Sequence, residues 1–259
     1  MFHYLICSTA RVGSNLLCSL LNGTRVVGHP QEFFCPFTVA DLGPKLCGLD
    51  SVTNTDELHR FIDAAAATYS SQGRFGIKAH YLQLQAALQA GYDLEGRFPD
   101  RFVHVNRADV LGQAMSYVRA SQTGAWTAQK QERCEHRFQP ELIRATIQRL
   151  NAENHAWEVL FQRYDVEPYR LSYERLCADF EGELARLLAH LDVDPTTVDV
   201  AGAVARATKH FKTQRDAVSA EWRERYLEWV KRRAQLQHDS FAARHAASAS
   251  VTSPAVSAA

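Results

Sequence analysis

The N-terminal stretch Tyr4–Leu21, with the sequence YLICSTARVGSNLLCSLL, limits what this chain can fold into. Its first residues, Tyr4–Cys7, form a short apolar run of the kind found in buried parallel strands. Small and polar residues follow over Ser8–Ser14, and Asn15–Leu21 is apolar at helical spacing. A strand, a tight loop and a helix in this order predict a phosphate site, because loop amides and the positive end of the helix dipole converge on one anion.

The loop after the strand carries residue types that hold a phosphate. Gly13 lets the backbone approach a ligand closely, Ser14 offers a hydroxyl donor, and Arg11 can place a cation over the anion. The GxxxxGK[ST] motif of Walker A loops is absent. An ordinary strand-to-helix turn is the alternative interpretation. We predict that the anion is held by Ser8, Thr9, Ala10, Arg11, Val12, Gly13, Ser14 and Asn15.

Short strands and helices alternate along the rest of the chain. Further strands are predicted at Arg25–Gly28, Arg74–Lys78, Arg101–Asn106 and Val166–Ser172. Helices are predicted at Thr55–Ser70, Leu82–Ala90, after Arg107, over 139–164, at Tyr173–Leu191 and at Ala220–Gln237, with residues 37–54 as a loop. This alternation predicts an α/β fold, a P-loop-like three-layer sandwich with a central parallel sheet flanked by helices. Ligands of such sheets bind at the carboxyl ends of the strands.

Length and composition restrict the class of protein. We predict a single domain over residues 1–241 and a disordered tail over 242–259, which is rich in Ala and Ser and has no periodicity. The 29 basic and 29 acidic residues give no bulk attraction to nucleic acid. The six cysteines include no CxxC pair, and the chain shows neither a signal peptide nor an apolar run of membrane-spanning length. These features predict a cytoplasmic protein that binds no nucleic acid.

A second phosphate site is predicted beyond the strand Arg101–Asn106. Arg107 follows this strand directly, and Ser116 lies in the helix that comes next. If that helix packs beside the first strand–loop–helix unit, both side chains reach a phosphate outside the first loop. Two such sites suit a nucleotide with phosphates on its 5′ and 3′ sides. None of the predicted strands ends in an acidic residue, so no metal site is predicted and a Mg²⁺-dependent NTPase is disfavoured.

Glu32 is the candidate general base. It lies between Pro30 and Phe33 in a rigid, apolar loop, where burial is expected to raise its pKa toward the range useful for proton transfer. An exposed loop carboxylate is the alternative, and His29 is a second candidate base. Trp126 can stack on a sugar face, although a core tryptophan is equally consistent with the sequence.

Together these segments resemble the bacterial trehalose 2-sulfotransferase family, which is related to lipopolysaccharide and Nod-factor sulfotransferases. The resemblance covers the chain apart from its tail. It is carried by Tyr4–Leu21, Gly28–Phe34 (GHPQEFF), Gly76–Lys78, His104–Trp126 (HVNRADVLGQAMSYVRASQTGAW), Val166–Leu176 and Gln214–Tyr226.

The resemblance implies sulfuryl transfer from 3′-phosphoadenosine-5′-phosphosulfate (PAPS) to a hydroxyl of a carbohydrate or glycolipid, without a metal. Arg11 matches the cation of the 5′-phosphosulfate loop, Arg107 and Ser116 match the 3′-phosphate pair, and Glu32 matches the general base. The family is often dimeric, which makes a homodimer an expectation here. A late segment that closes over the nucleotide corresponds to residues 214–222, so Gln214 and Trp222 join the donor-binding set. The predicted acceptor-binding residues are His29, Gln31, Phe33 and Trp126.

Two positions depart from the family pattern. Asn15 stands where the loop usually carries Thr or Ser, and His29 stands where trehalose-specific members carry an acid. Imidazole in place of a carboxylate is expected to change which acceptor hydroxyls are bound. Three alternatives remain at this stage: a P-loop kinase, a nucleotide-binding regulatory protein, and an α/β domain that binds only adventitious phosphate.

Overall fold

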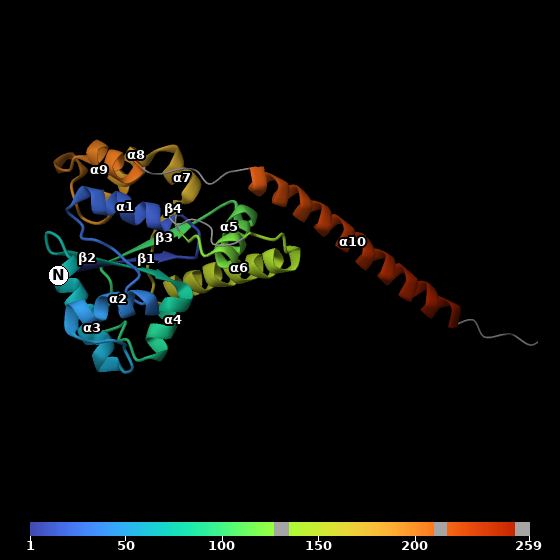
Figure 1. The fold of residues 1–259 in the computed structure, drawn as a ribbon, viewed down its shortest axis with the longest axis horizontal. Coiled ribbons are helices and arrows are strands. Elements are labelled where there is room, and N and C mark those ends of the chain that lie inside the picture. The colour runs from blue at the N-terminus through green and yellow to red at the C-terminus, as the bar shows by residue number, and fades with distance from the viewer. Residues whose placement is uncertain (127–134, 210–216, 252–259) are drawn as a thin grey trace, which may run out of the picture.

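The computed structural model describes residues 1–126, 135–209 and 217–251 (Figure 1). In these residues the strands are β1 (Phe2–Ser8), β2 (Arg74–His80), β3 (Arg101–Asn106) and β4 (Tyr169–Ser172). The helices are α1 (Ser14–Thr24), α2 (Pro36–Cys47), α3 (Thr55–Tyr69), α4 (Tyr81–Gln89), α5 (Val110–Thr123), α6 (Pro140–Arg163), α7 (Tyr173–Ala178), α8 (Phe180–His190), α9 (Val200–Thr208) and α10 (Ala217–Val251), with a 3₁₀ turn at Pro195–Thr197.

The described strands form one parallel sheet in the order β2-β1-β3-β4. The chain leaves β1 for β2 on one side and later adds β3 on the other, so the direction of winding changes between β1 and β3. In doubly wound sheets the ligand crevice lies at this switch point, outside the carboxyl ends of the strands. The register pairs Ser8 with His80 and Cys7 with His104, which brings the loops after three strands to the same edge.

Helices cover both faces of the sheet, as a three-layer sandwich requires (Figure 1). Alternate residues of β1 enter opposite cores, because side chains of a strand point to opposite faces. Tyr4 and Ile6 pack with α1, α7, α8 and α9, whereas Leu5 and Cys7 pack with α2, α3, α4 and α6. The predicted fold class is therefore confirmed.

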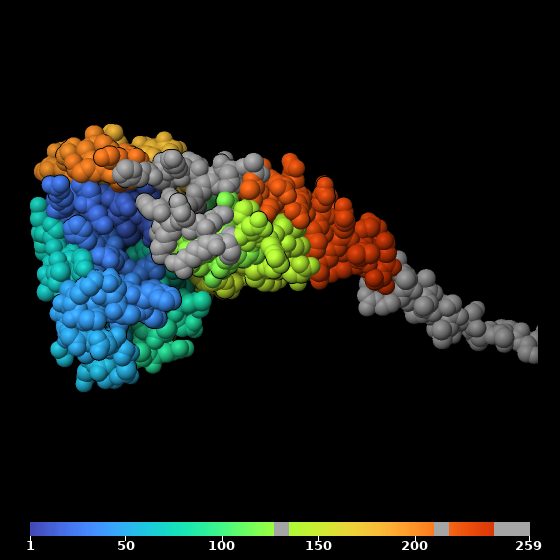
Figure 2. Space-filling view, in the orientation of Figure 1, coloured from blue at the N-terminus to red at the C-terminus, as the bar shows by residue number. Residues whose placement is uncertain are grey.

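A third, smaller core joins α5, α6 and the beginning of α10. It contains Met115, Ile143, Leu150, Trp222 and Tyr226. The first turns of α10 lie against α5 and α6 (Figure 2). The remainder of the helix extends away from the body of the protein (Figure 1). This core brings α6 beside α5, which matters for the walls of the cleft described below.

Two predicted elements are wrong. Arg25–Gly28 is a loop and not a strand. The Val27 carbonyl accepts a hydrogen bond from the Tyr4 hydroxyl at 3.0 Å, which fixes this loop against β1. Residues 37–54 are not all loop, because α2 occupies Pro36–Cys47. Pro36 begins this helix, where its missing N–H costs nothing, and Gly48 ends it with φ of 69°. The internal Gly43 and Pro44 disguised the helical pattern.

The last part of the chain also differs from expectation. The predicted helix Tyr173–Leu191 is two helices, because Asp179 leaves helical geometry and caps α8 by accepting the Gly182 amide at 2.8 Å. α9 was not predicted. α10 continues to Val251, which differs from the expected disorder from Ala242, and residues 252–259 lie outside the described residues.

Candidate active site

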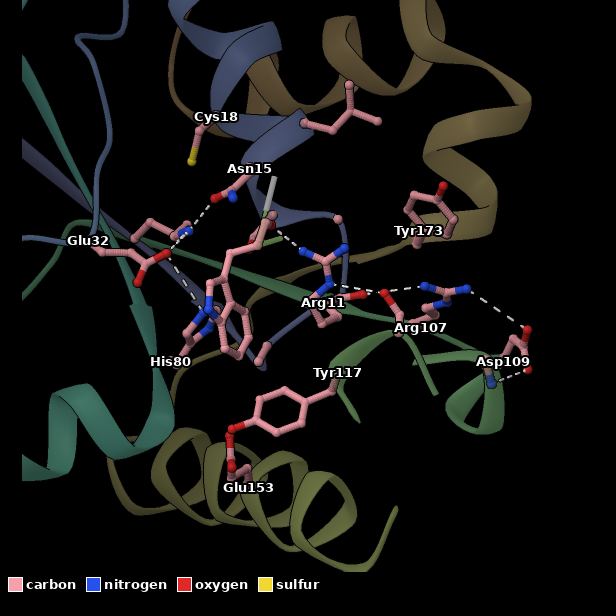
Figure 3. A pocket seen from close by; sticks show the side chains of 18 of the residues that line it. Arg11, Asn15, Cys18, Glu32, His80, Arg107, Asp109, Tyr117, Glu153 and Tyr173 are labelled. Carbon is pink, nitrogen blue, oxygen red and sulfur yellow. Dashed lines mark hydrogen bonds and ion pairs between the residues drawn. The ribbon is translucent and has the colours of Figure 1, made fainter. Parts of the chain in front are cut away.

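A cleft of about 1500 Å³ opens at the carboxyl ends of β1, β2 and β3. It lies at the switch point of the sheet, where the fold class places ligands. Its walls come from the loop after β1, the end of β2, the loop after β3, α5 and α6 (Figure 3). The beginning of α10 also lines the cleft.

The predicted anion loop divides into an inner and an outer half. Ser8, Thr9 and Val12 are fully buried. The Ser8 hydroxyl donates to the Ala79 carbonyl at 3.2 Å, and the Gln113 amide donates to the Thr9 hydroxyl at 2.8 Å. These inner residues anchor the loop, whereas Ala10, Arg11, Gly13, Ser14 and Asn15 line the cleft.

The outer half of the loop presents an open helix N-terminus. The amides of Leu16 and Leu17 both bond the Gly13 carbonyl, at 3.0 and 3.2 Å. The amides of Ser14 and Asn15 precede these bonds in the first turn of α1, where helix geometry provides no partner. Their N–H groups and the helix dipole favour an anion at this point of the cleft.

Replacing Gly13 by Ala is expected to destabilise the protein by about 2–4 kcal/mol. Gly13 has φ of 92°, and a Cβ there would lie 2.4 Å from Cδ2 of Tyr173. Urea unfolding measures the loss. The double variant with Tyr173→Ala removes the clash but keeps the backbone strain, so it should recover part of the stability. Full stability in Gly13→Ala would contradict the close packing of the loop against α7.

The predicted second phosphate pair lies beside this loop. Nε of Arg11 donates to the Ser116 hydroxyl at 3.0 Å, and Nη1 of Arg107 donates to the Arg11 carbonyl at 3.4 Å. Arg107 lies 5.0 Å from the ring centroid of Tyr173, and among the described residues its buried Nε has no hydrogen-bond partner. Burial and the nearby Arg107 lower the pKa of Arg11. The structure thus brings together two guanidinium groups and a hydroxyl.

Glu32 lies across the cleft and is held by three side chains. Its carboxylate accepts hydrogen bonds from Lys78 and, at 2.6 Å, from Gln83, and Nε2 of His80 is 3.8 Å away. Burial alone would raise the pKa of Glu32, but the charge of Lys78, then His80 and the hydrogen bonds, outweigh it and lower the pKa. The expectation of a raised pKa is wrong, because the sequence did not reveal the cation beside the carboxylate.

Lys78 and His80 are site residues that the sequence analysis missed. Lys78 is buried at the end of β2 and donates to both Glu32 and the Asn15 side chain, which links the carboxylate to the anion loop. Nδ1 of His80 lies 3.0 Å from the Ser8 hydroxyl, and burial, then Lys78, lowers the pKa of His80 to about 4. The sequence held one signal for them: Lys78 and His80 are polar residues at alternate positions at the end of a buried strand, so both side chains point to the same face of the sheet.

Only two of the four predicted acceptor-binding residues line the cleft among the described residues. Gln31 and Trp126 line the cleft. Phe33 is fully buried against Phe61 and Phe75, and the exposed His29 is not among the described residues that line the cleft.

The late segment 214–222 also differs from the expectation. Trp222 packs in the core between α5, α6 and α10 instead of lining the cleft, because its large apolar ring finds neighbours such as Phe138 there. Gln214 lies outside the described residues.

Two further findings concern the described residues. They contain no helix both long and apolar enough to cross a membrane. They also contain no group of at least three His, Cys, Asp or Glu side chains arranged to hold a metal ion. The prediction that no metal takes part stays a prediction.

Comparisons with known proteins identify the family. A structure of a sulfotransferase from Alicyclobacillus acidocaldarius aligns with a TM-score of 0.44 at 15% identity, over 86% of this chain and 99% of that one. The trehalose 2-sulfotransferases of Mycolicibacterium smegmatis and Mycobacterium tuberculosis are each 26% identical to the present chain. The alignments cover 86% of this chain and 93% of each relative. The model of the Stf0 sulphotransferase family matches residues 3–228. The expected resemblance is confirmed: the chain belongs to the Stf0 sulphotransferase family and is a sulfotransferase.

Proposed function

We propose that the protein transfers the sulfuryl group of PAPS to a hydroxyl of a carbohydrate or glycolipid, with Glu32 as general base. One observation supports this more than any other. Lys78 bonds both Glu32 and Asn15, so the carboxylate and the anion loop face the same cleft across a single cation. A carbohydrate acceptor agrees with the trehalose 2-sulfotransferases among the relatives.

In the proposed step, the acceptor oxygen attacks sulfur in line with the bond to the 5′-phosphate. The new O–S bond forms as the S–O bond to the phosphate breaks, and the hydroxyl proton passes to Glu32. The negative charge that leaves with adenosine 3′,5′-bisphosphate lies against Arg11, the amides of Ser14 and Asn15, and the helix dipole.

The lowered pKa of Glu32 has a consequence for the base. At neutral pH its carboxylate is ionised and ready to accept a proton. In the free enzyme Lys78 forms an ion pair with this carboxylate. A donor anion bound in the cleft gives Lys78 a second negatively charged partner. We propose that Lys78 moves toward the donor and leaves Glu32 more basic when the acceptor is present.

Two histidines, His29 beside Glu32 in the sequence and His80 at the end of β2, are alternative bases. His29 is exposed and donates its amide to the Tyr69 carbonyl at 2.8 Å, away from the residues that line the cleft. His80 lines the cleft beside Glu32 and, with its lowered pKa, is neutral at neutral pH. Glu32 remains the proposed base because its carboxylate lies between Lys78 and Gln83 at the cleft wall.

Calorimetric titration of the purified protein tests the donor. Adenosine 3′,5′-bisphosphate is expected to bind in the absence of metal, and ATP with Mg²⁺ is expected to bind more weakly. Incubation with ³⁵S-labelled PAPS and candidate sugars then tests transfer. Tight binding of ATP with Mg²⁺ and indifference to the 3′-phosphate would replace this proposal by a P-loop-type kinase.

Replacing Arg107 by Ala is expected to weaken adenosine 3′,5′-bisphosphate binding by about ten- to hundred-fold, because a charge-assisted bond to the 3′-phosphate is lost. Titration of the same variant with adenosine 5′-phosphosulfate, which lacks that phosphate, should show little change. An equal loss for both ligands would contradict the assignment of Arg107 to the 3′-phosphate.

The remaining assignments are also proposals. We propose one catalytic domain over residues 1–241, a homodimer, and a cytoplasmic location. Size-exclusion chromatography with light scattering tests the homodimer, and a monomeric mass would contradict it.

A further inference from the structure

Gln83 lines the cleft from the first turn of α4 and has no role in the step proposed above. Both ends of its side-chain amide are engaged. Oε1 accepts a hydrogen bond from the main-chain N–H of His80 at 2.9 Å, and Nε2 donates to Oε2 of Glu32 at 2.6 Å. Figure 3 shows Glu32 and His80 at the same side of the cavity. The proposed general base is therefore tied, through Gln83, to the main chain at the beginning of a helix.

The cap of α4 decides which end of the Gln83 amide faces Glu32. His80 is the N-cap residue, and Gln83 is the third residue of the helix, the position from which a side chain reaches back to the N-cap amide. That amide can only donate, so the oxygen of Gln83 turns toward it and the NH₂ group turns toward the carboxylate. Glutamate fills this helix position in other caps as well as glutamine does, but only glutamine has a donor left for Glu32.

The main chain that carries Glu32 is fixed to the end of β2. Gln31 forms an isolated parallel bridge with Ile77, and its carbonyl accepts the Lys78 amide at 2.9 Å. Because the main chain is held in this way, the freedom left to Glu32 is rotation of its side chain. Gln83 and Lys78 restrict that rotation, since each bonds a different oxygen of the carboxylate.

The two partners of the carboxylate differ in what they can do during the reaction. Lys78 also donates to Asn15 of the anion loop, so a donor anion can draw it away from the carboxylate, as proposed above. Gln83 carries no charge, and the main chain of His80 holds its oxygen. A hydrogen bond from a neutral and anchored donor persists when the cation moves. Gln83 is thus the partner that can hold the carboxylate while its basicity rises.

The titratable groups around Glu32 leave room for an effect of Gln83. Burial tends to raise the pKa of Glu32, and Lys78, then His80, then the hydrogen bonds from Lys78 and Gln83, lower it. Lys78 and His80 come from β2, and Cys18 of α1 lines the same cleft. Burial raises the pKa of the Cys18 thiol to about 11, so this group is uncharged at neutral pH. Among these neighbours Gln83 does not titrate, so it can donate to the carboxylate at any pH.

We propose that Gln83 is a positioning residue for the general base: the His80 amide anchors it, and its NH₂ group holds the Glu32 carboxylate in the orientation that receives the proton of the acceptor hydroxyl. Gln83 acts through Glu32 and does not itself touch the reacting atoms. This inference rests on the proposed sulfuryl transfer with Glu32 as base. It adds that a capping residue of α4 limits the pH range of turnover, because a carboxyl group without this donor takes up its proton at higher pH.

The variant Gln83→Glu tests this role. Its carboxylate still accepts from the His80 amide, so the cap of α4 is kept, but a second carboxylate then faces Glu32 in place of a donor. Two carboxylates in contact share a proton, which raises the pH at which the pair is fully ionised. At neutral pH kcat is expected to fall by about ten-fold or more, and the acidic limb of the pH–rate profile should move upward by at least about one pH unit.

Gln85→Glu is the matched control, because Gln85 is an exposed residue of the same helix. This control should leave kcat and the pH–rate profile unchanged. Gln83→Met removes both hydrogen bonds and is expected to lower kcat and the melting temperature together. If Gln83 served only to cap α4, Gln83→Glu would retain the turnover and the pH–rate profile of the unsubstituted protein, and that result would refute the positioning role.

A direct titration of Glu32 separates the two levels of failure. Carbon-13 NMR of protein labelled at the glutamate carboxyl carbon follows this titration, and the signal of Glu32 is assigned by its absence in Glu32→Gln. In Gln83→Glu the carboxyl group of Glu32 is expected to titrate at higher pH, and an unchanged titration would overturn the proposal. If the unsubstituted protein transfers no ³⁵S from labelled PAPS, the proposed function fails and the positioning role fails with it. If transfer occurs and the titration shifts while Gln83→Glu turns over normally, the positioning role alone is refuted.

Discussion

Replacing Glu32 by Gln is expected to reduce kcat by at least about a hundred-fold, because the acceptor hydroxyl loses its proton acceptor. The amide keeps the shape of the side chain, so the dissociation constant of adenosine 3′,5′-bisphosphate should change little. Transfer of ³⁵S from labelled PAPS measures turnover, and calorimetry measures binding. Glu141→Gln, on the exposed part of α6, is the control for the chemical change.

The same variant carries a stability signature. Lys78 is buried, and without Glu32 it loses its charged partner at a cost on the order of 3 kcal/mol. The melting temperature of Glu32→Gln should fall, and adenosine 3′,5′-bisphosphate should raise it by about as much as in the unsubstituted protein, since the dissociation constant of this ligand changes little. Normal turnover in this variant would show that Glu32 is not the base, and His80 would be the next residue to test.

Replacing Lys78 by Met is expected to abolish most turnover, by about a hundred-fold or more, because the cation between the base and the donor is lost. Burial tends to raise the pKa of Glu32, and Lys78 is the largest influence that lowers it. Without Lys78 the carboxyl group takes up its proton at higher pH. The acidic limb of the pH–rate profile should therefore move to higher pH.

The exposed Lys45, paired with Asp41 on α2, provides the matched control Lys45→Met. The control should leave both kcat and the pH profile unchanged. An unshifted acidic limb in Lys78→Met, with residual activity sufficient to measure it, would show that the titrating base is not the carboxylate beside Lys78. Unfolding of Lys78→Met is monitored by circular dichroism, and Lys78→Arg keeps the charge if the Met variant does not fold.

Much of the fold follows from local patterns. The apolar run Tyr4–Cys7, the polar loop after it and the helical spacing from Asn15 specify β1 and α1, because strand and helix periodicities are properties of short segments. β3 and α5 were predicted for the same reason. α2 and α9 were not, since their stability depends on packing that no single segment reveals: Ala203 of α9 is fully buried against α1.

The site was predicted in part for a similar reason. Arg11, Arg107 and Ser116 follow strands whose carboxyl ends meet at one edge of a parallel sheet, and topology alone places them together. The sequence could not show that Phe33 and Trp222 are core residues and not ligand-binding residues, because aromatic side chains occur in both places. Burial decides between the two, and burial is a property of the assembled fold.

The sequence by itself determined the parallel α/β fold, the strand–loop–helix unit at its N-terminus and Glu32 as a carboxylate in the same cleft as that loop. Only the tertiary structure decided the electrostatic state of that carboxylate. Lys78 lies forty-six positions from Glu32 along the chain, and β2 brings the two into contact beside Asn15. A pKa is set by the charges and solvent around a group in space, so the direction of its shift became visible only when β2 was placed beside the loop that carries Glu32.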